Sequence, residues 1–409
     1  MNILIIHAHT ANRGDESAVK AMCDELLAKY PDINITIALN GITRYPNMPK
    51  QVTMIDGFFK SKDRKAQIGF FLAIISKGLI RYSASINTFI KALDKADLVV
   101  HAPGGPSIGD IYSKKEFIYL STLRFAKRRG KNYMFYAPSM GPFNLTRRNK
   151  KRIKVLMDAK CVLLRDPISY KYVENLAPKC NPILALDSAL QHDFDVAINE
   201  DKYQNYKSLV EYLSKYEKTV GLTITDLKWH QKYKNADFQD NLKTTFDRFI
   251  GKRISEGYGI VFIPQLYGAG NDESLMNQFM VDDKTFIIKS DVEDYDSYFQ
   301  QYVISKLFAV VGMRYHSNIF SAKVGTPFIS VSYEQKMKGF MESIECSQYC
   351  IDLERLSPNV LEKRFQDLLE NYQSYKKYLY EKHDWMKKRS HISSDKVFEI
   401  IELNQKKVF

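Results

Sequence analysis

An arginine and a histidine lie two positions apart, directly after a short apolar run at residues 309–311. They are Arg314 and His316, and they begin a segment with helical periodicity. An arginine can hold a carboxylate or phosphate through two parallel hydrogen bonds, and a histidine can add a donor or carry a proton. The pair therefore suits an anionic substrate. A structural interpretation stays open, in which Arg314 pairs with a nearby acid and His316 is a satisfied, half-buried histidine.

Two strands and a helix must position these side chains. The apolar run before Gly312 predicts a buried strand, and the segment after it predicts a helix that ends at the Gly-Thr-Pro sequence of residues 325–327. Residues 328–332 predict a second strand. This strand–helix–strand unit places Arg314 and His316 at the carboxyl end of a strand beside a helix N-terminus. Open α/β sheets bind anions at such places.

Two carboxylates, Asp15 and Glu16, lie after another predicted strand, residues 2–6, at the start of a helix over about residues 16–30. Their structural role there is capping and dipole compensation, worth about 0.5–1 kcal/mol each. Because their loop follows the carboxyl end of a strand, they are also candidates for acid/base chemistry or for contacts to sugar hydroxyls.

A glycine-rich loop follows a further strand predicted at residues 98–102. Gly104 and Gly105 let the backbone approach a ligand, and their amides can cradle negative oxygens. A tight structural turn explains both glycines equally well. It does not require Asp110, which is therefore an acid/base candidate.

Arg165 and Asp166 follow a strand-like segment at residues 161–164. Asp166 with Pro167 predicts a helix N-cap, which explains the aspartate. Arg165 has no such explanation and is the second candidate for gripping a phosphate or carboxylate. Asp187 lies near the predicted end of the first domain and is a further acid/base candidate.

Strands and helices alternate through both halves of the chain. In the second half, strands are predicted at residues 219–225, 260–264, where Gln265 follows, and 286–289, with helices at 238–256 and 297–308. The alternation predicts an α/β protein of two Rossmann-like domains facing across a cleft, the glycosyltransferase-B arrangement. No Gly-x-Gly-x-x-Gly fingerprint opens either half, which disfavours a dinucleotide site.

Composition narrows the partners. A chain of 409 residues predicts two domains, and a net charge of +13 indicates attraction to nucleic acid, acidic lipid or a phosphorylated substrate. The sequence shows no RNA-binding module or helix-turn-helix signature, so nucleic acid ranks last and no nucleic-acid partner is expected. Five scattered cysteines predict reduced thiols in a cytoplasmic protein.

The amino terminus and one internal segment bear on localisation. The apolar run at residues 2–6 meets His7 and His9 at once, which indicates a strand and not an export signal. Residues 68–80 form the longest apolar stretch, too short for the roughly 20 residues that span a bilayer. With the basic residues around it, including Lys62, the stretch is either a membrane-surface helix or a core helix with solvated charges.

Four short motifs follow one another along the chain. They are Asn-x-Gly-Asp-Glu at residues 12–16, Pro-Gly-Gly at 103–105, Arg-Asp-x-x-Ser at 165–169, and Gly-x-Arg-x-His at 312–316 followed by Gly-x-Pro at 325–327. In this order they resemble the motifs of the polysaccharide pyruvyl transferase family. A tyrosine at position 315 stands where aliphatic residues are common in the family, so packing on the donor side is expected to differ.

The resemblance implies a transferase without cofactor or metal, for which phosphoenolpyruvate is a co-substrate. The enolpyruvyl carbon would acquire two sugar hydroxyls and lose phosphate, which leaves a cyclic pyruvate ketal. The expected substrate-binding residues are Arg314, Tyr315, His316, Arg165, Asn12, Gly104, Gly105 and Gln265, and the acid/base candidates are His316, Asp15, Glu16, Asp110 and Asp187.

The resemblance also assigns domains and partners. Residues 1–190 would form the acceptor side, residues 191–390 the donor side, and residues 391–409 a helix that crosses back to the first domain. The acceptor would be a sugar of a cell-surface polysaccharide or of its diphosphate-lipid-linked precursor, and the enzyme would be cytoplasmic or peripheral to the cytoplasmic membrane.

Two other functions stay open at this point. A nucleotide-sugar glycosyltransferase of the same fold would use Arg314 to grip a diphosphate and would ignore phosphoenolpyruvate. A non-catalytic assembly protein of the cell envelope would keep its function after Arg314→Ala. Fold alone does not choose among the three.

Overall fold

The chain forms two compact units. The computed structural model describes residues 1–60, 63–111, 113–228, 230, 232–268, 270–290, 292 and 294–405. The first unit comprises Met1–Ala11, Asp15–His192 and Lys387–Phe409, and the second comprises Asn12–Gly14 and Asp193–Met386. The short segment Asn12–Gly14 thus belongs with the second unit, although the first unit surrounds it in sequence.

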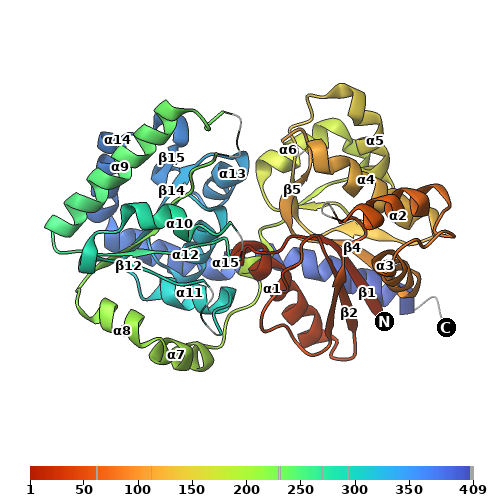
Figure 1. Ribbon diagram of the computed structural model, residues 1–409, viewed down its shortest axis with the longest axis horizontal. Coiled ribbons are helices and arrows are strands. Elements are labelled where there is room, and N and C mark those ends of the chain that lie inside the picture. The colour runs from red at the N-terminus through yellow and green to blue at the C-terminus, as the bar shows by residue number, and fades with distance from the viewer. Residues whose placement is uncertain are drawn as a thin grey trace. The chain divides into compact units, whose positions relative to one another are not determined.

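A five-stranded parallel sheet forms the centre of the first unit (Figure 1). Its strands in spatial order are β3 (Val52–Asp56), β2 (Asn34–Leu39), β1 (Asn2–Ala8), β4 (Leu98–His101) and β6 (Tyr133–Phe135). Its helices are α1 (Arg13–Lys29), α2 (Arg64–Ile75), α3 (Ala84–Lys95), α4 (Ser113–Arg128), α5 (Thr146–Met157) and α6 (Pro167–Leu176). The strand at β3 was not predicted, because its half-buried residues form no apolar run.

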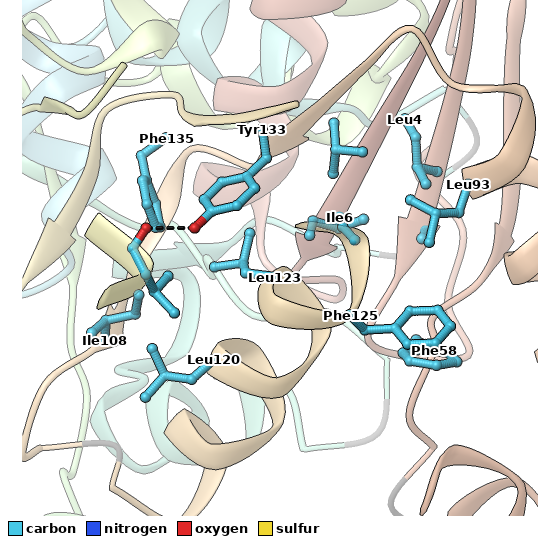
Figure 2. Packing of buried hydrophobic residues seen from close by; sticks show 14 of the residues in the cluster. Leu4, Ile6, Phe58, Leu93, Ile108, Leu120, Leu123, Phe125, Tyr133 and Phe135 are labelled. Carbon is cyan, nitrogen blue, oxygen red and sulfur yellow. Dashed lines mark hydrogen bonds between the residues drawn. The ribbon is translucent and has the colours of Figure 1, made fainter. Parts of the chain in front are cut away.

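Side chains alternate between the two faces of this sheet, as they must along a strand. Leu4 and Ile6 of β1 pack in the cluster that also takes residues from α2, α3 and α4, which Figure 2 shows. Within it, Phe58 stacks against Phe125, with ring centroids 4.9 Å apart. The neighbouring residues of β1, Ile3 and Ile5, pack on the other face with residues of α1 and of the C-terminal helix. A sheet covered on both faces is the doubly wound arrangement.

Two small parallel sheets extend the first unit. One pairs β5 (Gly104–Ile108) with β7 (Pro138–Met140), and the other pairs β8 (Leu163–Leu164) with β9 (Ile183–Leu184). The segment after β4 was expected to be a loop. It is a strand instead, and its glycines give it an irregular register with β7.

A six-stranded parallel sheet forms the centre of the second unit. In spatial order its strands are β12 (Thr285–Ile287), β11 (Gly259–Phe262), β10 (Thr219–Thr223), β13 (Ala309–Gly312), β14 (Phe328–Ser332) and β15 (Cys350–Asp352). Its helices are α7 (Val196–Asn205), α8 (Lys207–Ser214), α9 (Ala236–Ser255), α10 (Glu273–Met276), α11 (Ser297–Ser305), α12 (Tyr315–Val324), α13 (Gln335–Ser343) and α14 (Pro358–Glu370). The predicted strand–helix–strand unit is β13, α12 and β14, and this prediction is confirmed.

One 34-residue helix, α15 (Tyr372–Gln405), closes the described chain. Its residues from Lys387 onward belong to the first unit, where Val397, Phe398 and Ile401 join the core beside β1. Of the predicted C-terminal segment, residues 406–409 lie outside the described residues. None of the helices in the described ranges combines the length and apolarity needed to cross a membrane.

Candidate active site

Arg314 is held at the carboxyl end of β13 as the N-cap residue of α12. Its backbone N–H donates to Thr223 Oγ1 at 3.3 Å, and its carbonyl accepts from Ser317 Oγ at 2.7 Å. The turn before it needs a glycine, because a Cβ at Gly312 would overlap the side chain of Asn318. These contacts fix the backbone position from which the Arg314 side chain extends.

The Arg314 guanidinium forms an ion pair with Asp272, whose side chain is 5% exposed. The other Asp272 oxygen accepts the backbone N–H groups of Gln265 and Leu266, each at 3.0 Å. Burial opposes the charge of Arg314, but Asp272 and Tyr333 raise the pKa of the arginine above its usual value. Arg314 therefore stays a cation.

Two buried polar atoms near this pair are unsatisfied. Within the described ranges, neither Arg314 Nε nor Gln265 Oε1 has a hydrogen-bond partner. The Gln265 amide nitrogen instead donates to Gln300. Buried polar groups are rarely left without partners, so each such group calls for an explanation, and a bound polar ligand would supply one. Arg314 therefore has the acidic partner, Asp272, that a purely structural role requires, yet its Nε can still donate a hydrogen bond to a ligand.

The segment Asn12–Gly14 packs against His316. A Cβ at Gly14 would overlap the imidazole, so only glycine fits there. The Gly14 N–H donates to Asn12 Oδ1 at 2.8 Å, and Asn12 forms an isolated antiparallel bridge with Leu266. The second unit thus brings together four predicted residues, Arg314, His316, Asn12 and Gln265. His316 is buried, at 7% exposure, and not half-buried.

Arg13 is a residue of this region that the sequence did not single out. Its guanidinium carbon lies 4.0 Å from the ring centroid of Tyr267 and 4.9 Å from that of Tyr295. Its Nη2 donates to the Ser290 carbonyl at 2.8 Å, and its backbone N–H donates to the Gln265 carbonyl at 2.9 Å. The signal was available, because Arg13 is the variable position of the Asn-x-Gly-Asp-Glu motif.

Tyr315, the remaining substrate-binding candidate of this unit, is buried in the first turn of α12. Its ring lies 4.9 Å from that of His316 and 6.2 Å from that of Phe340. The tyrosine therefore packs behind the histidine and limits where the imidazole can turn.

In the first unit, Arg165 pairs with Asp187. Arg165 Nη1 lies 2.6 Å from Asp187 Oδ2, and both side chains are almost fully buried. Its Nε donates to Ser139 Oγ at 2.9 Å and its Nη2 to the Gly105 carbonyl at 3.2 Å. Every nitrogen of this guanidinium has a partner within the protein, so Arg165 has the structural explanation that its sequence context did not provide. The predicted N-cap at Asp166 is confirmed.

Asp15 and the glycine strand lie together in the first unit. A Cβ at Gly104 would come within 2.7 Å of Asp15 Oδ1, and Gly104 and Gly105 have φ of +118° and +101°. Both observations explain why this strand needs glycine. Glu16, next along α1, is fully buried.

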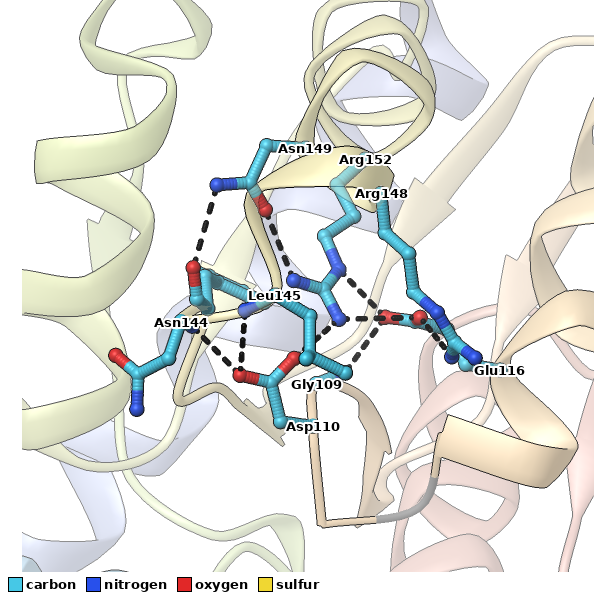
Figure 3. A network of polar contacts seen from close by, with 9 residues as sticks. Gly109, Asp110, Glu116, Asn144, Leu145, Arg148, Asn149 and Arg152 are labelled. Atoms are coloured by element: carbon cyan, nitrogen blue, oxygen red, sulfur yellow. Dashed lines mark hydrogen bonds and ion pairs between the residues drawn. The ribbon is translucent and has the colours of Figure 1, made fainter.

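Asp110 belongs to a separate network, shown in Figure 3. Its carboxylate accepts the backbone N–H groups of Asn144 and Leu145 at 2.6 and 3.1 Å and pairs with Arg152 at 2.6 Å. Arg152 also pairs with the buried Glu116 at 2.7 Å. Asp110 thus ties two loops together, which gives it a structural role that the sequence did not show.

Three histidines and a tyrosine form a cluster that the sequence did not suggest. His7 and His9 lie at the end of β1, His101 lies at the end of β4, and Tyr119 lies on α4. The ring of His7 is 4.8 Å from that of His101 and 4.4 Å from that of Tyr119. Burial lowers the pKa of His101 to about 4 and holds that of His7 well below its usual value. Both buried imidazoles are therefore neutral at pH 7.

No group of three or more His, Cys, Asp or Glu side chains gathers as metal ligands would, as far as the described residues go. The second unit gathers Arg13 and Arg314 with His316, and the first unit gathers the neutral imidazoles of His7 and His101 beside His9.

Comparison with known proteins identifies the family. The family model described as polysaccharide pyruvyl transferase matches residues 12–335, which include all four motifs. The chain belongs to the polysaccharide pyruvyl transferase family. It is therefore a transferase of polysaccharide pyruvylation, and the non-catalytic alternative is wrong.

A curated relative covers nearly the whole chain. The amylovoran biosynthesis protein AmsJ of Erwinia amylovora is 23% identical over 405 residues, which span 91% of this chain and 93% of the relative. That protein is named for the biosynthesis of amylovoran.

Solved structures share the fold at low identity. A UDP-GlcNAc 2-epimerase from Neisseria meningitidis has a TM-score of 0.60 and 13% identity, covering 98% of this chain and all of its own. A UGT transferase from Siraitia grosvenorii has a TM-score of 0.55 and 10% identity, with the same coverage. This likeness confirms the Rossmann-like glycosyltransferase-B fold, and it does not indicate which substrate this chain binds.

Proposed function

We propose that this member of the family moves the enolpyruvyl group of phosphoenolpyruvate onto two hydroxyls of one sugar, giving a cyclic pyruvate ketal and phosphate. The observation that carries the proposal is the arginine site of the second unit, defined as Arg13, Arg314 and His316. The two arginines and the imidazole all belong to the second unit, where Arg314 Nε and Gln265 Oε1 lack hydrogen-bond partners among the described residues.

This site suits the donor's charge. Phosphoenolpyruvate carries a carboxylate and a phosphate, and an arginine with free N–H groups binds such oxygens more strongly than a neutral donor does. The N-terminus of α12, where Arg314 is the N-cap, adds a favourable dipole. His316 then holds the phosphate or moves a proton, and no cofactor or metal is required.

The acceptor is proposed to be a sugar of a cell-surface polysaccharide or of its diphosphate-lipid-linked precursor, used in the cytoplasm. Asp15, beside Gly104, and Glu16 belong to the first unit and remain the carboxylate candidates for contacts with this acceptor. Asp110 and Asp187 are weaker candidates, since each already neutralises a buried arginine.

A lipid-linked acceptor would bring the enzyme to a membrane, and α2 offers a surface for that. One side of this helix is buried through Phe70 and Ala73, yet Ile68, Phe71 and Ile75 on it are 50%, 47% and 81% exposed, and Leu79 just beyond it is 87% exposed. A helix that is apolar all round is normally buried on every side.

Charge indicates what covers the exposed side. Residues 60–82 contain six basic residues and one acidic residue. Of these, Lys62 lies outside the described residues. An apolar stripe flanked by cations matches an anionic lipid surface, into which apolar side chains insert while the cations meet headgroups. We therefore propose peripheral association through α2 with anionic membranes.

Vesicle binding tests this association. The wild type should sediment with phosphatidylglycerol vesicles and not with phosphatidylcholine vesicles, and Ile75→Gln/Leu79→Gln should weaken binding about tenfold or more. The matched control is Val196→Gln/Ile198→Gln, whose residues are 64% and 56% exposed on α7. Equal binding by both double variants would contradict the proposal, and a dimer that only the α2 variant disrupts would make a second copy the occupant.

The second candidate function is a nucleotide-sugar glycosyltransferase, favoured only by the fold of its structural neighbours. Thermal denaturation separates the two. Phosphoenolpyruvate at a hundred times its dissociation constant should stabilise the wild type by about 2.7 kcal/mol and leave Arg314→Ala unchanged. The exposed Arg44→Ala is the control. Stabilisation by UDP-sugars alone, without phosphate release from phosphoenolpyruvate, would favour the glycosyltransferase.

A further inference from the structure

The histidine–tyrosine cluster, defined as His7, His9, His101 and Tyr119, has the chemistry of a hydroxyl-binding site. His7 lies one residue before the end of β1 and His9 directly after it, and His101 ends β4, the strand paired directly with β1. Tyr119 reaches the cluster from α4, and its hydroxyl lies 3.3 Å from His9 Nε2. The carboxyl ends of two adjacent parallel strands thus carry three imidazoles at the edge where α/β proteins bind ligands.

The backbone around His9 adopts uncommon conformations. His7 has φ of +65° and Ala11 has φ of +60°, both in the left-handed region that residues other than glycine seldom adopt. The register between β1 and β2 also shifts between Ile5 and Ala8. Such conformations persist where the surrounding structure enforces them, and they gather at functional sites.

The buried imidazoles are short of partners. In the part of the chain that the structure describes, neither ring nitrogen of His7 forms a hydrogen bond, and His101 Nε2 has no hydrogen-bond partner either. His101 Nδ1 lies 2.9 Å from the Ala102 carbonyl, so it carries the proton and leaves Nε2 as an acceptor. His9 is more exposed than its two neighbours and is the member that a ligand reaches first.

The groups that face His9 come from several elements. The Tyr119 hydroxyl from α4 contacts its ring, and His7 of β1 and His101 of β4 lie close enough to interact with it electrostatically. Asp15 on α1 acts on Tyr119. Asn40, after β2, donates to the Tyr119 hydroxyl at 3.3 Å. His7 and His101 are neutral at pH 7, and Asp15 is the charged group that acts on this cluster. The site therefore favours uncharged, hydrogen-bonding ligands over anions.

We propose that this cluster binds the hydroxyls of the acceptor sugar, and that His9 accepts the proton of the attacking hydroxyl. Tyr119, whose hydroxyl lies 3.3 Å from His9 Nε2, is a positioning residue for that imidazole, and His7 and His101 pack against Tyr119. The inference rests on the proposed function and adds to it a general base, a role that was not assigned to any one of the carboxylate candidates.

The proton balance of the reaction needs such a base. Two C–O bonds form at C2 of the enolpyruvyl group while its bond to the phosphate oxygen breaks with the electron pair. Of the two hydroxyl protons, one ends on the methylene carbon, which becomes methyl, and the other ends on phosphate. His9 carries a proton between these stages and has passed it on by the end of each turnover.

Steady-state kinetics with phosphoenolpyruvate and an accepted sugar test the assignment. His9→Ala should lower kcat about a hundredfold or more, as loss of a general base does, while stabilisation by phosphoenolpyruvate stays at the wild-type value. His9→Gln should behave alike, because glutamine keeps the hydrogen bond and cannot take the proton. Tyr119→Phe should shift the acid limb of the pH–rate profile, which a merely structural role would not move.

His192→Gln is the matched control, because His192 is a histidine of the same unit that pairs with Glu25 at 2.9 Å. It should keep wild-type kcat and pH profile. A wild-type kcat in His9→Ala overturns the inference while leaving the proposed function intact.

Binding without turnover gives an independent measurement. Methyl glycosides should shift the imidazole NMR resonances of His9 and leave those of His192 in place, whether or not phosphoenolpyruvate is consumed. Absence of any His9 shift across a panel of methyl glycosides overturns the inference. Such a shift in a protein that consumes no phosphoenolpyruvate would instead contradict only the proposed function.

Discussion

The two units each carry an arginine–aspartate pair, and the pairs differ in what they leave available. In the first unit, Ser139, Asp187 and the Gly105 carbonyl occupy every nitrogen of Arg165. In the second unit, Arg314 pairs with Asp272, and its Nε has no partner among the residues described. A buried arginine can therefore complete the fold or await a ligand, and only the count of its hydrogen bonds distinguishes the two cases.

The same contrast extends to the neighbouring side chains. The second unit places the cation Arg13 between Tyr267 and Tyr295, whereas the first unit gathers neutral imidazoles. Charge favours an anionic donor in the second unit and an uncharged hydroxyl acceptor in the first. The following predictions test this division.

The largest effect is expected from Arg314→Ala. Loss of a cation that binds the transferred phosphate lowers rates about 10³- to 10⁵-fold in related phosphate chemistry, and we expect phosphate release to fall by at least 10³-fold. The variant should still fold, because Asp272 keeps two backbone donors. Turnover within tenfold of the wild type would remove the basis of the comparison.

The next largest effect is expected from Arg165→Met. Removing one partner of a buried ion pair leaves Asp187 uncompensated, and unfolding by urea should show a loss of about 3–5 kcal/mol. Arg165→Met/Asp187→Leu should recover part of that loss. Wild-type stability together with lost stabilisation by phosphoenolpyruvate would make Arg165 a ligand group after all, as its sequence context suggested.

An acid-dependent loss of stability should follow from the buried imidazoles. The pKa of His101 is about 4 in the folded protein, against an ordinary value near 6.5, because burial opposes its charge. In the unfolded chain this histidine therefore binds a proton below about pH 6.5, whereas in the folded protein it does so only near pH 4.

Stability from this residue is complete above pH 6.5 and falls by up to about 3 kcal/mol as the pH drops to 4. Urea unfolding at pH 7 and pH 5 should show the decrease, and His101→Asn should reduce it. The half-buried His391, which lies 3.7 Å from Glu25, provides the control His391→Gln. An equal pH dependence in all three proteins would refute the neutral-imidazole description.

The smallest effect is expected from Glu273→Gln. Burial opposes the charge of Glu273, but hydrogen bonds from Ser290 and the nearby Lys289 outweigh it and lower the carboxyl pKa. Its contribution is present above the ordinary glutamate pKa of about 4.3 and is lost as the pH falls through the lower folded value.

Because the site is partly solvated, the difference between wild type and Glu273→Gln should stay below about 1 kcal/mol at pH 7 and vanish near pH 3. Ser290 also accepts from Arg13, so the variant should weaken phosphoenolpyruvate binding by less than about tenfold. A larger loss of binding than of stability would show that Ser290 transmits the effect to the arginine site.

The fold was largely predictable because its signals are local. The strand–helix–strand unit of β13, α12 and β14 follows from apolar runs and from Gly325, which has the left-handed φ of +73° expected of a helix stop. The glycine segment that became β5 misled the prediction, since glycines commonly mark turns and here allow a strand to pass close to Asp15.

The site was predictable only in part, because partners distant in sequence decide what a polar residue does. Arg314 and His316 carry a local motif, whereas nothing near Arg165 reveals that Asp187 neutralises it. Arg13 occupies the variable position of a motif, so the motif does not mark it. The sequence around His7 and His9 indicates only the end of a strand, and the contact of His7 with His101 depends on the pairing of β1 with β4.

The continuous helix α15 has a consequence for the gene. Its residues up to Met386 belong to the second unit, and those from Lys387 complete the apolar core of the first. Neither half of the coding sequence therefore encodes a whole unit, and a recombination event that exchanged the first 192 codons would deliver a sheet with one face uncovered. Chimaeras between relatives should fold only when the last segment travels together with the first.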